Sequence, residues 1–133
     1  MPDAIKIPIS LRNWFFVHFL VDYIFAIPLF LFPQQTLAFF GWGVIDQITT
    51  RLVAAALLGI GGVSLVARKS DAVVYKHLLI MKIIWSLSVV AGILLSAATG
   101  AVPPFIWAVL AIFVLFASIW IYYYCILCKK LKQ

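Results

Sequence analysis

The chain has 133 residues, of which 66% are hydrophobic and only 11% are charged, whereas a soluble domain carries about 25% charged residues. These values exclude an ordinary soluble domain and indicate one domain, covering residues 1–133, whose solvent is the lipid bilayer. The net charge of +6 does not indicate a nucleic-acid partner, because the basic residues stand at the ends of apolar runs, where anionic lipid headgroups explain them better.

Four apolar runs are long enough to cross the hydrocarbon core as helices, which takes about 20 residues. They cover residues 11–32, 48–66, 73–99 and 104–128. Strands are excluded, because the runs do not alternate and only helices satisfy their own backbone in lipid. The first run is too long for a signal peptide and is expected to stay as a membrane span. The predicted fold is an all-α integral membrane protein, an antiparallel bundle of four transmembrane helices joined by short loops.

The first run contains an imidazole and a carboxylate. His18 and Asp22 are four residues apart and share one helix face. The other residues predicted on that face are Phe15, Phe25, Ala26 and Leu29. Asp22 lies roughly 16 Å along the helix from Leu11, near the middle of the membrane. A charge at that depth is costly, so Asp22 should face the bundle or a watery cavity. Two interpretations stay open: a protonated or hydrogen-bonded carboxyl group with a structural role, or a site for a ligand or a proton.

Prolines and an acid predict the ends of the helices. Pro28 is expected to bend the first helix and Pro33 to end it. Residues 34–43 are rich in aromatic side chains and predict a short segment in the membrane interface. Asp46 is the expected N-cap of the second helix, and Pro104 suits the start of the fourth.

Arg51 stands alone near the outer ends of the predicted spans. One interpretation is an interfacial anchor that pairs with Asp46 beside Trp42. The other is an anion contact at an outer vestibule, which would make Arg51 a ligand-binding residue. We expect Arg51 to serve structure more than function.

Small residues recur at helical spacing on the second and third runs. Such residues let helix backbones approach closely in lipid. They indicate either packing inside one bundle or the interface of a homo-oligomer. The residues are Ala55, Gly59, Gly62 and Val66 on the second run, and Ser88, Gly92 and Ser96 on the third.

The third run contains Lys82, roughly 13 Å from its start and therefore close to the depth of Asp22. Lys82 is the natural charge partner of Asp22, and Trp85 and Ser86 share its helix face and would line a pocket there. The alternative is that the ammonium group snorkels to the cytoplasmic surface, which the lean of helical side chains toward the N-terminus makes easy.

The fourth run ends in aromatic residues and two cysteines. Trp120, Tyr122, Tyr123 and Tyr124 predict an aromatic belt at the inner interface, with a quinone or lipid-headgroup site as the alternative. Cys125 and Cys128 form a C-x-x-C pair. They are too few to hold a metal by themselves and lie where thiols stay reduced. No catalytic residue, metal or cofactor is predicted.

The basic residues predict the orientation. Nine of them fall on one side of a four-span arrangement and only Arg51 falls on the other. Both termini should therefore face the cytoplasm, with the protein in the inner or plasma membrane. The nine are Lys6, Arg12, Arg68, Lys69, Lys76, Lys82, Lys129, Lys130 and Lys132.

One stretch carries a resemblance to a known family. Pro33 follows the first span, and "DQITTRLVAAALLGIGG" places Asp46 and Arg51 ahead of a small-residue helix. In these features the first two spans resemble small four-span membrane proteins of the DoxX-like type. The resemblance implies a compact bundle and, in some members, a supporting part in redox complexes; it implies no catalytic residue.

Three functions stay open. The leading hypothesis is a non-enzymatic bundle that binds or transports a small ligand through a polar cavity between the first and third spans, with Asp22 as the key group beside His18 and Lys82. The second is an accessory subunit that stabilises a larger membrane complex through a partner protein. The third is an enzyme that acts on a lipid or a quinone.

Overall fold

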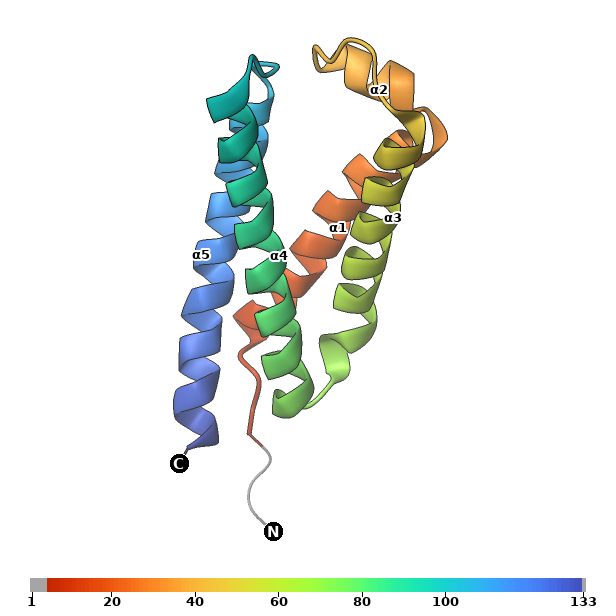
Figure 1. Ribbon diagram of the computed structural model, residues 1–133. Helices are drawn as coiled ribbons and strands as arrows, with labels where there is room; N and C mark the ends of the chain where they lie inside the picture. Colours follow the sequence, from red (N-terminus) through yellow and green to blue (C-terminus); the bar gives the residue numbers. More distant parts are fainter. Residues whose placement is uncertain (1–4, 133) are drawn as a thin grey trace. The chain divides into compact units, whose positions relative to one another are not determined.

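The computed structural model describes residues 5–132, and every regular element in that range is helical. Four helical segments are long and apolar enough to cross a membrane. The all-α prediction is confirmed, and the predicted spans match the helices to within three residues at each end. The elements are α1 (Ile9–Leu31), α2 (Pro33–Phe39), α3 (Gln47–Val66), the 3₁₀ turn η1 (Ala67–Lys69), α4 (Ala72–Thr99) and α5 (Ile106–Leu131) (Figure 1).

The chain divides into two compact units. The first unit, Pro8–Lys69, contains α1, α2, α3 and η1. The second unit contains α4 and α5, within residues 70–132, together with residues 5–7. The predicted single domain over residues 1–133 stays a prediction.

In the first unit, prolines set the end of α1 and the start of α2. Pro28 lies inside α1, and its carbonyl oxygen accepts a hydrogen bond from the Phe32 N–H at 2.8 Å. Phe32 then leaves helical dihedral angles, as expected for a residue before proline. Pro33 opens α2, where its missing N–H costs nothing. The predicted end of the first helix is confirmed, and the segment after it is a two-turn helix.

The buried face of α3 differs from the prediction. Its N-cap is confirmed, since the Asp46 carboxylate accepts from the Thr49 N–H at 2.7 Å. The buried stripe is shifted by one residue from the predicted stripe. Val66, at the end of the predicted stripe, is 83% exposed, and nothing lies within 4 Å of a side chain added at Gly59. A step of one residue turns a helix by about 100°, and small residues occur on both faces. The observed stripe is Ala54, Leu57, Gly61 and Ser64.

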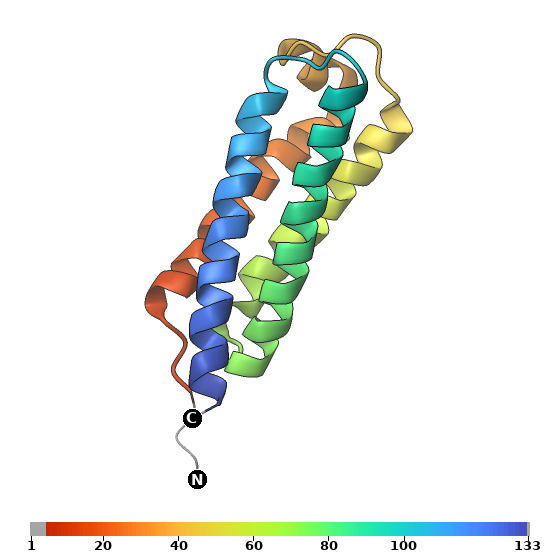
Figure 2. The same cartoon turned by 60° about the vertical axis from the view of Figure 1, so that its left-hand side comes forward.

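In the second unit, α4 and α5 lie side by side and run in opposite directions (Figures 1 and 2). The Asp71 carboxylate caps α4 by accepting from the Val74 N–H at 2.9 Å. The predicted start of the fourth helix at Pro104 is too early. A turn precedes α5, closed by a 3.0 Å hydrogen bond from the Ile106 N–H to the Pro103 carbonyl, and the helix begins at Ile106.

The buried stripes of α4 and α5 consist mainly of large side chains. The predicted small-residue stripe of α4 is exposed at Ser88, Gly92 and Ser96, with nothing within 4 Å of a side chain added at Gly92. Large side chains are favoured at buried positions because they bury more apolar surface and make more van der Waals contacts than small ones. The buried residues are Ala72, Tyr75, Leu79, Lys82, Ser86 and Ile93 on α4, and Phe116, Ala117, Trp120, Tyr123 and Leu127 on α5.

The aromatic end of α5 is therefore divided between two environments. Trp120 is fully buried and Tyr123 is 8% exposed, whereas Tyr122 is 62% exposed. The prediction of an interfacial belt is wrong for Trp120 and Tyr123, because helical geometry points successive residues in different directions. Tyr122 keeps the exposure that a belt residue needs.

Candidate functional site

A buried ionisable pair lies on α1, near the middle of the helix. The His18 Nδ1 atom and the Asp22 Oδ2 atom are 2.9 Å apart, with one helical turn between the residues. His18 is 2% exposed and Asp22 is 5% exposed, so both side chains face protein atoms. The imidazole nitrogen and the carboxylate oxygen therefore form a close polar contact inside the protein. The predicted face is buried at Phe15, His18, Asp22 and Ala26 but only half-buried at Phe25 and Leu29. The structure brings the two candidates His18 and Asp22 into contact.

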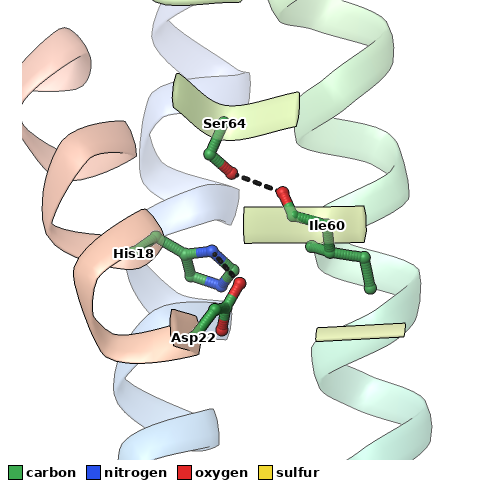
Figure 3. Close-up of polar contacts among 4 residues, drawn as sticks. All are labelled: His18, Asp22, Ile60 and Ser64. Atoms are coloured by element: carbon green, nitrogen blue, oxygen red, sulfur yellow. Dashed lines mark hydrogen bonds and ion pairs between the residues drawn. The ribbon is translucent and has the colours of Figure 1, made fainter. Parts of the chain in front are cut away.

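The imidazole and the carboxylate point toward α3 (Figure 3). A Cβ atom added at Gly61 would lie 2.8 Å from Asp22 Cβ and 3.1 Å from Asp22 Oδ2. Gly61 therefore lets α3 come close enough to cover the carboxylate. One turn on, the Ser64 hydroxyl donates to the Ile60 carbonyl at 2.7 Å (Figure 3). The sequence analysis did not identify Gly61 as a site residue. It could have been found as a glycine on the second predicted span at about the same membrane depth as Asp22 on the first.

Arg51 lies at the opposite end of the first unit's helices from η1 and contacts backbone rather than an acid. Its Nε donates to the Phe30 carbonyl at 3.1 Å, and its Nη1 donates to Gln47 Oε1 at 3.4 Å. The predicted pairing with Asp46 is wrong: no ion pair joins them within the described residues. The last carbonyls of a helix lack intrahelical donors and carry partial negative charge, so a cation is favoured there. Arg51 thereby ties the end of α1 to the first turn of α3.

Asp46, which was expected to pair with Arg51, caps the start of α3 instead. Asp46 accepts from the first turn of α3, and this hydrogen bond from the Thr49 backbone N–H lowers the pKa of the Asp46 carboxyl group below its ordinary value of 3.8. The Thr50 hydroxyl also donates to the Asp46 carbonyl at 2.8 Å. This corner is a capping structure, so it supports the structural interpretation of Arg51.

In the second unit, Lys82 lies against an aromatic face. Lys82 is 1% exposed, and its Nζ lies 5.2 Å from the centroid of the Trp120 ring. Phe116 stacks on Trp120 at 5.6 Å with an interplanar angle of 9°. Snorkelling to the surface is thus not observed, because the ring face offers the ammonium group an electrostatic contact inside the protein. The sequence analysis did not identify Trp120 as a site residue. The available indication was a large aromatic residue on the predicted span that follows the one with Lys82.

The neighbouring candidates on α4 are hydrogen-bond donors. The Ser86 hydroxyl is buried and has no hydrogen-bond partner within the described residues, and neither has Trp85 Nε1. By contrast, Ser64, Ser96 and Ser118 each donate to the carbonyl four residues earlier. A buried polar group without a partner costs about 1–3 kcal/mol. This face of α4 therefore offers donors to an acceptor group.

Two further predictions concern the pairing of Asp22 with Lys82 and the two cysteines of α5. Asp22 and Lys82 belong to different units, so their pairing stays a prediction. Cys125 and Cys128 are free thiols, the first exposed and the second half-buried.

No protein-family model, curated protein or solved structure matches this chain. The resemblance to DoxX-like proteins stays a prediction.

Proposed function

We propose that the chain is an integral membrane protein whose four long helices form one antiparallel bundle, with both termini on the cytoplasmic side. The four helices long and apolar enough to span a membrane support this. So do the basic residues: with Lys82 set aside as buried, eight stand at one end of the spans and Arg51 at the other. Accessibility of terminal tags in intact cells tests the orientation, and a C-terminus on the outer side would contradict it.

We propose further that the protein binds, and moves across the membrane, a proton or a small cation at the His18–Asp22 pair. The observation that carries the proposal is the 2.9 Å contact between two buried ionisable groups at mid-helix. Replacing such a pair by apolar residues is often neutral or stabilising in proteins. A pair that stability does not require is therefore better explained by the protons or cations that it can exchange.

Lys82, Trp85 and Ser86 enter this proposal as the donors of the second unit. Lys82 has three N–H donors, and the Ser86 hydroxyl and Trp85 Nε1 have no partner in the described residues. Together they suit an acceptor such as a carboxylate or an ordered water molecule. Arg51 has no role in this binding, since its guanidinium group holds the end of α1.

The experiment is a flux measurement in proteoliposomes with an internal pH dye and imposed proton or sodium gradients. The Asp22→Asn substitution keeps the shape of the side chain but removes its charge. We expect wild-type protein to dissipate one of the gradients faster than protein-free liposomes, and Asp22→Asn to fall to the protein-free rate. Asp71→Asn is the matched control, because it removes the same charge while asparagine still caps α4.

Folding is followed by circular dichroism and gel filtration. If Asp22 has only a structural role, Asp22→Asn should be nearly neutral for stability, since an amide is cheaper to bury than a charge. Flux through folded Asp22→Asn equal to that of wild type would contradict the proposal, as would wild-type protein no faster than empty liposomes.

A second candidate is an accessory subunit of a larger membrane assembly. The exposed Ser88, Gly92 and Ser96 stripe favours it, because small residues suit close contact with another helix. Molecular mass in detergent, with co-purifying proteins identified, separates the two candidates: an accessory subunit is recovered with a partner and shows no flux when purified alone.

A further inference from the structure

Two arginines, Arg12 and Arg68, lie near Phe16 of α1 in the first unit, at the end that also holds η1. Arg12 lies one turn before Phe16 on α1, so the two side chains are neighbours on the helix surface. The Arg68 guanidinium carbon lies 4.8 Å from the centroid of the Phe16 ring. Arg12 and Arg68 are thus both neighbours of Phe16, the first along α1 and the second from η1. We call the surface formed by these three residues the Arg12–Arg68 patch.

Arg12 carries a donor without a partner. Its Nε is buried and makes no hydrogen bond within the described residues. The buried N–H of a charged group is costly to leave unsatisfied. The remainder of the Arg12 side chain is half-exposed, and Phe16 is 37% exposed, so the patch can be reached from outside.

The three aspartates within the described residues have contacts other than Arg12. Asp22 contacts His18, and the Asp46 and Asp71 carboxylates accept from backbone N–H groups at the starts of α3 and α4. The sequence contains no glutamate. None of these three carboxylates forms an ion pair with Arg12, so the anion that would complement this guanidinium has to come from outside the described chain.

We propose that the Arg12–Arg68 patch binds the phosphate group of an anionic phospholipid. A guanidinium group presents its N–H donors as a planar fork that matches phosphate oxygens two at a time. The patch lies where an apolar helix meets the basic end of the spans, which is the depth of a headgroup. The first turn of α1 adds to this, because it contains no acid and no side-chain cap. The inference rests on the proposed membrane insertion but not on the ligand site at Asp22.

A lipid is favoured over free phosphate by the surroundings of the patch. Phe16 has apolar, exposed neighbours on α1, including Val17 at 39% and Leu20 at 41% exposed. These side chains provide a surface for an acyl chain directly beside the headgroup position. A soluble phosphate ion would use the guanidinium groups and leave that apolar surface bare.

The test measures lipid affinity by native mass spectrometry of the full chain in detergent. Phosphatidylglycerol is titrated against phosphatidylcholine, with inorganic phosphate as a third arm. We expect wild-type protein to retain phosphatidylglycerol preferentially. Arg12→Gln and Arg68→Gln should each raise its apparent Kd about tenfold, the loss expected for hydrogen bonds to a charged group.

Two variants separate a built site from general surface charge. Lys130→Gln removes the same charge from the exposed end of α5 and should leave the apparent Kd unchanged. Phe16→Leu keeps both arginines but removes the ring against which Arg68 lies, and should weaken lipid binding. If a glutamine variant does not fold, Phe16→Leu still tests the patch.

An equal loss in Lys130→Gln and in both arginine variants would overturn the proposal in favour of nonspecific attraction. Displacement of the lipid by millimolar inorganic phosphate would overturn the lipid assignment. Protein that retains no lipid but still supports flux through Asp22 would reject this inference alone, whereas lipid retention without flux would reject only the proposed function.

Discussion

The first and second units each bury an ionisable side chain well inside a long apolar helix, and they surround it differently. In the first unit, Asp22 has a polar neighbour on its own helix and a glycine opposite, so the backbones of α1 and α3 come close. In the second unit, Lys82 lies over the ring of Trp120, and Phe116 stacks on the same ring.

The difference follows from the chemistry of the two charges. A carboxylate accepts hydrogen bonds, so a donor such as His18 one turn away is the cheapest neighbour that a helix can supply. An ammonium group is attracted by the negative face of an indole ring, which here is that of Trp120. The first unit is therefore expected to be sensitive to added volume at its glycine, and the second to the loss of its aromatic layer.

The largest expected effect is in the second unit, at Trp120. Trp120→Ala removes a fully buried ring and the face on which Lys82 rests, and should destabilise the protein by about 3–5 kcal/mol. Unfolding in detergent with increasing SDS, followed by circular dichroism, measures it. Trp107→Ala on the same helix is the control, because Trp107 is 49% exposed.

The same experiment tests the cation–π contact. Adding Lys82→Met to Trp120→Ala should recover part of the loss, since no ammonium group is then left without its ring. Full additivity of the two substitutions would show that the ring and the ammonium group do not interact.

The next effect is in the first unit, at Gly61. Gly61→Ala places a methyl group 2.8 Å from Asp22 Cβ, so α1 and α3 have to move apart, at a cost of about 1–3 kcal/mol. Gly59→Ala adds the same methyl group where nothing lies within 4 Å and should be neutral or stabilising, because alanine favours helix more than glycine does. The same unfolding assay compares them, and equal losses would mean that Gly61 does not set the spacing.

A smaller effect is expected at the corner of the first unit. Arg51→Gln removes the donor to the Phe30 carbonyl and should cost about 0.5–1.5 kcal/mol, the net value of one hydrogen bond. Gradient dissipation in proteoliposomes should be unchanged. A folded Arg51→Gln protein that lost all flux would show that Arg51 takes part in binding after all.

The smallest effect is a pH dependence at the same corner. The folded pKa of Asp46 lies below its ordinary value of 3.8 because the Thr49 N–H stabilises the carboxylate. The stability from this ionised cap is present above pH 3.8 and is lost as the pH falls below 3.8 and through the folded pKa. Asp46→Asn keeps a capping side chain but cannot titrate, so its thermal midpoint should fall less on acidification than that of wild type. Identical acid profiles would contradict this.

Much of the local structure follows from the sequence alone. Apolar runs of about 20 residues predict helices because no other regular structure satisfies its backbone in lipid. Pro33 and Asp46 mark helix ends because proline restricts the residue before it and an acid accepts the first N–H groups. The pairing of His18 with Asp22 was also predictable, since residues four apart in a helix are neighbours whatever surrounds the helix.

The tertiary structure decided what lies across from each helix. Periodicity could not choose between the adjacent stripes of α3 that contain Gly59 and Gly61, because both contain small residues at helical spacing. Nor could it show that Trp120 is the neighbour of Lys82, or that Arg51 donates to a carbonyl rather than to Asp46. These outcomes depend on contacts between segments far apart in the chain, and the energies of those contacts come from shape and distance, which the order of the residues does not reveal.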